Sequence, residues 1–238
     1  DDFKSLRYTV SGGEPLPGAV RDTFRERFGI TINEGYGLTE TSPVTNWCRP
    51  DEFRPGSVGR PIPLIDQRII DTATGRALPP NTDGEVWMRG PNVMRGYFNL
   101  PTETAKAFSE SGYFRTGDIG RFDDDGHLHI TGRLKEMLII GGENVFPREI
   151  EEVLERHPSV SASGVVGISD NMRGELPMAF VEIKEGAAFD EKELIGWCRQ
   201  HLAGYKVPDE VRRLDALPRN ATGKVMRREL KALAKTPG

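Results

Sequence analysis

The sequence predicts a mixed α/β and α+β protein, and three observations lead to this fold class. Residues 8–33 read as strand, glycine turn, helix and strand, an order typical of a parallel α/β layer. Residues 55–122 read as short strands broken by Pro, Gly and Asn, which indicates a small β region. Residues 137–233 alternate strands and helices over about 100 residues, the commonest domain size. We therefore expect two domains, 1–134 and 135–238.

The first layer follows from its apolar spacing. The stretch "LRYTVSGG" reads as a strand that leads into a glycine turn. Val20, Phe24 and Phe28 recur at helical spacing and Gly29 follows, so a helix is expected to end there. The stretch "ITIN" is the next expected strand.

The β region is predicted from the strands "QRIID", "GEVWMRG" and "YFRTGDIGRF", with one short helix at "TETAKAF". The stretch "FDDDGHLHITG" predicts a hairpin with Asp125 and Gly126 at its turn. It does not match a calcium loop, because Arg121 and Gly132 would fall on ligand positions. His127 and His129 face one side of a strand without a third ligand, which favours packing over a metal site.

The second domain is predicted from a strand at "MLII", a helix at "PREIEEVLERH", strands at "SGVVGIS" and "MAFVEIK", and a helix at "DEKELIGWCRQHL". A last basic helix is expected over "KVMRRELKAL", residues 224–233. Arg227 and Arg228 are expected on its solvated face.

Composition narrows the class of partner. The 238 residues carry 32 basic and 36 acidic side chains, a net charge of −4, so no single-sign field exists to hold nucleic acid or an anionic membrane. Small molecules are the expected partners. Cys48 and Cys198 lie far apart, which argues against a disulfide framework and favours a reducing, cytoplasmic setting. No apolar run approaches the roughly 20 residues that span a bilayer, and the start has no features of a signal peptide.

Two glycine-containing stretches suit a nucleotide. In "YTVSGGEPLP" the Gly-Gly turn lets the backbone approach a flat ligand, although it could be only a turn. In "NEGYGLTETSP", Gly35 and Gly37 flank Tyr36, whose ring offers a stacking face. Thr39 brings a hydroxyl for a phosphate oxygen and Glu40 an oxygen ligand for Mg²⁺. The alternative is a tyrosine packed under a loop beside a solvated glutamate.

Three further charged residues are candidates. Asp118 ends "YFRTGD", where its two oxygens could accept from the vicinal hydroxyls of a ribose or cap a turn. Arg133, in "GRLKE", could bind sugar hydroxyls or phosphate, or lie exposed on the surface. Lys224 follows an Asn, Thr and Gly loop that projects its charge at the expected start of the last helix.

In this order the motifs resemble the adenylate-forming (AMP-binding) superfamily. "SGGEPLP", "EGYGLTE", "YFRTGD", "GRLKEMLIIGGENVFPREIEEVL", "LAGYKVP" and "PRNATGKVMRREL" match its successive motifs across virtually the whole chain. "GYGLTETSPV" and "IIGGENVFP" are most similar to acyl-CoA ligases, especially the bacterial medium- and long-chain fatty acid type. The family's phosphate-binding loop has no counterpart here. The resemblance therefore implies the C-terminal portion of a longer enzyme: the end of its large domain at 1–134 and its small mobile domain at 135–238, inactive alone.

The resemblance implies a reaction in two steps. A carboxylate attacks the α-phosphorus of Mg·ATP and releases pyrophosphate, and the thiol of coenzyme A then attacks the acyl-adenylate. The implied nucleotide site has Tyr36 stacked on adenine, with Gly35 and Gly37 beside it and Gly13, Glu14 and Pro15 on the other side of the base. Thr39 is implied at the α-phosphate, Glu40 at the magnesium, and Asp118 and Arg133 at the ribose. Lys224 is implied at the carboxylate and α-phosphate oxygens.

The implied small domain pivots at Lys135, and Gly142 leaves space for the pantetheine arm of CoA. The expected partners are a carboxylic acid, with a fatty acid favoured, ATP and CoA. Three alternatives remain: an enzyme that loads a carrier protein, a luciferase-like oxidative enzyme, and a catalytically silent binding module.

Overall fold

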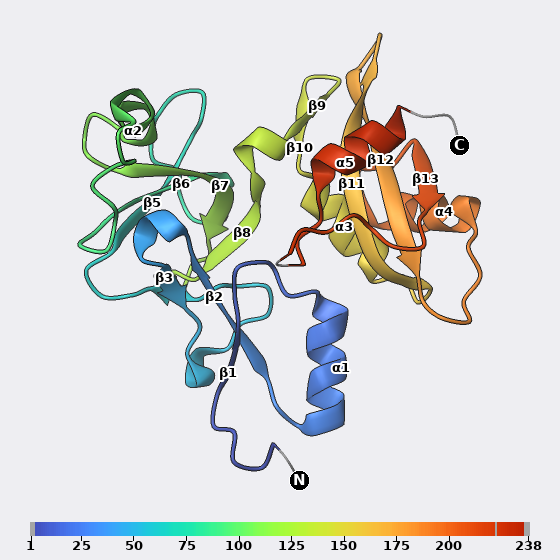
Figure 1. Cartoon of the computed structure of the whole chain (residues 1–238), viewed down its shortest axis with the longest axis horizontal. Helices are drawn as coiled ribbons and strands as arrows, with labels where there is room; N and C mark the ends of the chain where they lie inside the picture. The colour runs from blue at the N-terminus through green and yellow to red at the C-terminus, as the bar shows by residue number, and fades with distance from the viewer. Residues whose placement is uncertain (1–2, 222, 236–238) are drawn as a thin grey trace. The chain divides into compact units, whose positions relative to one another are not determined.

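The computed structural model describes residues 3–221 and 223–235, and the chain divides into two compact units, Asp1–Leu134 and Lys135–Gly238. The first unit contains two four-stranded sheets and the second contains one five-stranded sheet. Figure 1 shows the elements of each unit. None of the described helices is long and apolar enough to cross a membrane.

The first sheet has the order β1-β2-β3-β4. Strands β1 (Thr9–Ser11) and β2 (Ile32–Gly37) are parallel, and α1 (Gly18–Phe28) connects them. This confirms the expected parallel α/β layer. Gly29 ends α1 in the left-handed conformation, with φ of 68°, which a glycine adopts without a steric cost. Strands β3 (Val44–Trp47) and β4 (Arg60–Pro61) continue the sheet in antiparallel pairs, separated by the 3₁₀ turn η2 (Pro50–Glu52).

The second sheet is the antiparallel β region that the sequence predicts. Its order is β5 (Asp66–Ile70), β6 (Gly84–Arg89), β7 (Phe114–Phe122) and β8 (Leu128–Arg133), and the short helix α2 (Pro101–Ala107) precedes β7. A core packs on one face, made of Ile69, Val86, Met88, Phe114 and Leu128.

The hairpin between β7 and β8 is organised by Asp123. Its Oδ1 accepts from the backbone N–H of Asp125 at 3.1 Å and of His127 at 2.9 Å, and Gly126 has φ of 80°. His129 Nε2 lies 3.3 Å from Asp123 Oδ2, while His127 is 3% exposed. Within residues 3–221 and 223–235, no three His, Cys, Asp or Glu side chains gather in a way that could hold a metal.

The second unit alternates strands and helices, as expected. It begins within η3 (Leu134–Glu136) and continues through β9 (Leu138–Ile140), β10 (Glu143–Val145), α3 (Pro147–Glu155), β11 (Val160–Asp170), β12 (Gly174–Ile183), α4 (Glu191–His201), η4 (Gly204–Lys206), β13 (Glu210–Arg213) and α5 (Arg227–Ala234). The sheet order is β10-β9-β12-β11, and β13 pairs in parallel with β12.

Strand alternation buries both faces of this sheet. Val165 belongs to one core with residues of α3 and α4, whereas the next residue, Val166, belongs to a second core with Leu217 and with Leu230 of α5. Along β12 the same alternation separates Ala179 and Val181 from Met178 and Phe180. Both faces of the sheet are therefore packed against other elements of the unit.

Two sequence predictions for the end of the chain are wrong. Helix α5 begins at Arg227, not at Lys224, because the Lys224 N–H donates to Asn220 Oδ1 at 2.8 Å and its carbonyl accepts from the Asn220 N–H at 2.9 Å. The Arg227 guanidinium does not lie on a solvated face: it is held by carboxylates of Glu136 and Glu151. Short strands β3, β4, β10 and β13 are absent from the predictions.

Candidate active site

Asp118 is the centre of a cluster of predicted site residues in the first unit. Strand pairing places it on β7 directly across from Arg133 on β8. The Tyr36 hydroxyl donates to Asp118 Oδ2 at 2.6 Å, and Arg133 Nε donates to Oδ1 at 2.6 Å. Asp118 is 2% exposed, so a cation and a hydroxyl, not bulk water, stabilise its charge.

The cluster still has acceptor capacity. An ionised carboxylate has about four lone-pair sites, and the two bonds from Tyr36 and Arg133 use one on each oxygen of Asp118. Burial, followed by the charge of Asp118, raises the pKa of Tyr36 well above its ordinary value. The phenol therefore stays protonated at neutral pH and remains a donor that orients the carboxylate.

The predicted loop of Gly13, Glu14 and Pro15 lies beside β2. The backbone N–H of Leu16 donates to Glu34 Oε2 at 3.1 Å, and a Cβ on Gly12 would lie 3.3 Å from the carbonyl oxygen of Gly35. Glu34 is a buried residue on β2, 6% exposed. Its carboxylate thus fixes the loop next to the strand that carries the predicted stacking residue.

Gly13 and Gly37 are glycines for different reasons. A Cβ on Gly37 would lie 1.8 Å from the carbonyl oxygen of Pro43, a separation that two non-bonded heavy atoms do not tolerate. The space beside Gly37 is therefore filled by the chain itself. Gly13 has φ of +86° and nothing within 4 Å of its Cβ position, so its conformation requires glycine and its surroundings are open.

Thr39 and Glu40 lie in η1 (Thr39–Thr41), directly after β2. Glu40 Oε1 accepts from the Tyr97 hydroxyl at 2.9 Å, and the Glu40 backbone oxygen accepts from the N–H of Met94 at 2.7 Å. Burial, followed by the bond to Glu40, raises the pKa of Tyr97. Mg²⁺ is commonly bound by one or two carboxylates together with substrate phosphates. One positioned carboxylate such as Glu40 fits that arrangement.

In the second unit, Lys224 lies on a closed loop. Asn220 receives and donates bonds to the Lys224 backbone, Gly223 N–H donates to the Asn220 carbonyl at 2.9 Å, and Arg219 and Val225 form a β-bridge. Thr222, also part of the predicted loop, lies outside the described residues. The backbone of Lys224 is therefore fixed, while the residue is exposed.

Gly142 and Lys135 lie at the other end of the second unit's chain. Gly141 and Gly142 form the turn between β9 and β10, with φ of 61° and 89°, and nothing lies within 4 Å of their Cβ positions. The N–H of Gly141 donates to the carbonyl of Arg173 at 2.8 Å, which ties the turn to the β11–β12 hairpin. Lys135 lies in η3, where the second unit begins.

Comparisons with known proteins decide the family. The model of the AMP-binding enzyme family matches residues 1–98, and that of the AMP-binding enzyme C-terminal domain matches residues 149–224. The chain belongs to the AMP-binding, adenylate-forming superfamily. Within that superfamily it is of the acyl-CoA ligase type.

Three relatives illustrate the match to this superfamily. The chain is 41% identical to a long-chain-fatty-acid–CoA ligase of Bacillus subtilis, over 96% of this chain and 41% of that protein. It is 41% identical to a 2-succinylbenzoate–CoA ligase of Geobacillus kaustophilus, over 96% of this chain and 46% of that protein. The structure of ATP-bound MatB from Rhodopseudomonas palustris matches with a TM-score of 0.91 and 36% identity, over 96% of this chain and 46% of that one. The chain thus spans about half the length of these relatives.

The sequence predicts neither the contacts that Glu34 and Tyr97 make at the candidate site nor the buried position of Arg227. Glu34 directly follows the expected strand "ITIN", whereas the structure places it inside β2, where a buried acidic residue is unusual. Tyr97 contacts Glu40 from 57 positions away, which no local pattern shows. Arg227 lies three positions before the fully buried Leu230, and this spacing places both on one helix face.

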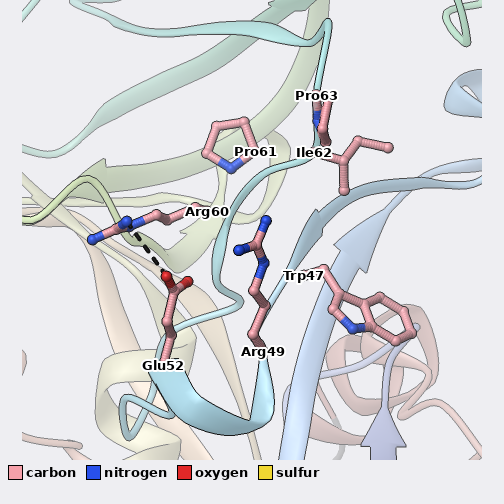
Figure 2. A pocket seen from close by; sticks show the side chains of 7 residues that line it. All are labelled: Trp47, Arg49, Glu52, Arg60, Pro61, Ile62 and Pro63. Carbon is pink, nitrogen blue, oxygen red and sulfur yellow. Dashed lines mark ion pairs between the residues drawn. The ribbon is translucent and has the colours of Figure 1, made fainter.

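A cavity of about 250 Å³ lies elsewhere in the first unit (Figure 2). It opens beside η2, and Arg60 NH1 lies 3.6 Å from Glu52 Oε1 across it. Its lining residues are Trp47, Arg49, Glu52, Arg60, Pro61, Ile62 and Pro63. No predicted nucleotide-site residue lines this cavity.

Proposed function

We propose that this chain supplies the nucleotide-binding cluster and the small mobile domain of an ATP-dependent acid–CoA ligase. The reaction begins when a carboxylate attacks the α-phosphorus of Mg·ATP, forming an acyl-adenylate and releasing pyrophosphate. The CoA thiol then attacks the acyl carbon, forming the thioester and releasing AMP. One observation carries the proposal: the family motif's Asp118 is a buried carboxylate held by Tyr36 and Arg133, with acceptor capacity left over.

The residues of the first unit bind the nucleotide in this proposal. Asp118 accepts from the ribose hydroxyls, and Arg133 both neutralises it and donates to the sugar. Tyr36 stacks on the adenine with the flanking Gly35 and Gly37, while the loop of Gly13, Glu14 and Pro15, which Glu34 holds beside β2, covers the other side. Thr39 donates to the α-phosphate, and Glu40 holds the magnesium.

The residues of the second unit act on the reacting groups. Lys224 donates to the carboxylate and α-phosphate oxygens as negative charge develops during adenylation. A preorganised donor of this kind is worth on the order of 3 to 4 kcal/mol in the transition state. The hydrogen bonds of its backbone support the role, because they fix the point from which the side chain projects. Gly142 leaves the pantetheine arm of CoA open space, and Lys135 is the pivot between the two half-reactions.

The acid is proposed to be a fatty acid. The motif resemblance to fatty acid ligases supports this, whereas equal identity to a 2-succinylbenzoate–CoA ligase supports a different acid. Mass spectrometry of the complete enzyme incubated with fatty or aromatic acids, ATP and CoA distinguishes these two substrate classes. Formation of aromatic thioesters alone would refute a fatty acid as the substrate. Loading of a carrier protein in preference to free CoA would favour the adenylation-enzyme alternative.

The test of the adenylation role uses the complete enzyme that contains this chain. Lys224→Ala should slow acid-dependent pyrophosphate release roughly 10²-fold or more while sparing thioester formation from supplied acyl-adenylate. Lys231→Ala is the matched control, because Lys231 is an exposed residue of α5. Equal loss in both half-reactions would contradict the assigned role of Lys224.

The test of the thioester role uses a bulky side chain at the β9–β10 turn. Gly142→Leu should slow CoA-dependent turnover and leave adenylate formation largely intact. Gly186→Leu is the matched control: it too has a positive φ, +79°, and nothing within 4 Å of its Cβ position. If CoA-dependent turnover is the same in both variants, Gly142 does not border the pantetheine path.

A further inference from the structure

Arg227 joins four elements of the second unit. Its Nε donates to Glu136 Oε2 at 3.0 Å, and NH2 donates to Glu151 Oε2 at 3.0 Å. Its NH1 donates to Glu151 Oε1 and to the carbonyl of Val165, the latter at 2.9 Å. These partners lie on η3, α3 and β11, and Arg227 itself is the first residue of α5.

Only an arginine side chain can make this set of hydrogen bonds to Glu136 and Glu151. The planar guanidinium meets Glu151 with two parallel bonds and Glu136 with a third, which the single ammonium of a lysine could not reproduce. The three side chains are only 12% to 25% exposed. Burial alone would lower the pKa of Arg227, but the bonds to Glu151 and Glu136 raise it, so the cation persists at every accessible pH.

The two carboxylates do different things. Glu151 already connects α3, β11 and α5, because its Oε1 also accepts from the Val165 N–H at 2.7 Å. Glu136 adds nothing to that connection. Its side chain ties only the segment that directly follows Lys135, the proposed pivot, to the first residue of α5, three positions after Lys224.

We propose that Glu136 and Arg227 are positioning residues that lock the segment after the pivot to the base of the Lys224 loop. The proposal rests on the proposed function of Lys224 and Lys135. With this lock in place, the backbone torsion change at the pivot is confined to Lys135. The segment after Lys135 and the Lys224 loop then move together. A misplaced donor loses transition-state stabilisation steeply, since displacements near 1 Å cost about 10²-fold.

The first experiment tests the lock in the chain itself by hydrogen exchange. Glu136→Ala keeps the Arg227–Glu151 bonds, so the unfolding midpoint should stay within about 3 °C of the wild type. Amides in a peptide covering residues 133–138 should exchange roughly tenfold faster, because a hydrogen bond to a charged group is lost from that segment. Glu185→Ala, an exposed glutamate on a turn, is the matched control and should change neither quantity. Unchanged exchange in Glu136→Ala would overturn the proposal.

The second experiment measures the two half-reactions in the complete enzyme. Glu136→Ala should lower kcat for adenylation roughly tenfold with KM for ATP within about twofold, because placement of Lys224 changes and nucleotide contacts do not. Thioester formation from supplied adenylate should change less than twofold. Equal loss in both steps, or none in adenylation, would overturn the positioning role. If the wild-type enzyme released no pyrophosphate with any acid, the proposed function would fail. The hydrogen-exchange result would still show whether Glu136 and Arg227 hold the segment after Lys135 in place.

Discussion

Glu155 provides a test of the second unit that is independent of any activity. This carboxyl lies at the end of α3, where its Oε1 accepts from the Ser163 N–H at 3.1 Å and from the Ser163 hydroxyl at 3.2 Å. Burial, reinforced by the charges of Glu151 and Glu152, raises its pKa to about 7 against the opposing effect of the Ser163 bonds. Between about pH 4.5 and 7, Glu155 in the folded chain therefore holds a proton that it has released in the unfolded chain.

The sign of the pH effect follows from this raised pKa. Below the ordinary value of 4.5 both states are protonated, and the group does not oppose folding. As pH rises from about 4.5 to 7, the unfolded chain ionises while folded Glu155 does not, so stability falls. Above pH 7 the loss is complete. Because one pKa unit corresponds to about 1.4 kcal/mol, the full loss is on the order of 3 kcal/mol.

The perturbation is Glu155→Gln, which keeps an oxygen that can accept from Ser163 and removes the charge. We expect urea unfolding at pH 8 to show this variant more stable than the wild type by about 1 to 3 kcal/mol, and nearly equal to it at pH 4. Glu185→Gln, at an exposed turn, should show no such pH-dependent difference. An equal offset between Glu155→Gln and the wild type at both pH values would refute the buried, protonated carboxyl.

Three further predictions concern packing and charge. Arg227→Ala should destabilise the second unit by about 2 to 4 kcal/mol in urea unfolding, because two partly buried carboxylates lose their partner, whereas the neighbouring, exposed Arg228→Ala should change it by less than about 0.5 kcal/mol. Gly37→Ala should lose more than about 3 kcal/mol by the same measurement, since its Cβ would lie 1.8 Å from the Pro43 carbonyl oxygen; a stable variant would show that the turn can shift. Asp118→Asn should weaken ATP binding to the complete enzyme roughly tenfold in calorimetry while the fold persists, and unchanged affinity would remove Asp118 from the nucleotide site.

Local spacing was enough to predict most of the elements. The apolar repeat of Val20, Phe24 and Phe28 and the stop at Gly29 gave α1 its correct end, because a left-handed cap is a local property. Strands β3, β4, β10 and β13 escaped prediction because each has only two to four residues. Their existence depends on pairing with distant strands, not on their own sequence.

The candidate site shows the same division between local and distant information. Side-chain chemistry was sufficient to propose Tyr36, Asp118 and Arg133, but their contact depends on the register between β7 and β8 and on a third strand from another sheet. The expectation for Arg227 failed because two adjacent arginines look alike in sequence. The helical spacing to the buried Leu230 separates Arg227 from Arg228, but the two acidic partners of Arg227 come from distant parts of the chain.

The construction of the second unit restricts how the proposed reaction can be organised. Its sheet is packed on both faces. The N–H of Gly141 ties the Gly142 turn to the β11–β12 hairpin, and Leu217 and Val225, on either side of the Lys224 loop, pack in the core with Leu230. The Lys224 loop and the Gly142 turn are therefore both attached to one packed sheet. In the proposed reaction, one rotation of the whole unit would bring each one to the reacting atoms in turn, with the flexibility outside the packed sheet. The bond from Arg227 to Glu136 connects the packed sheet to the residue directly after Lys135, which would confine the proposed pivot to a short segment.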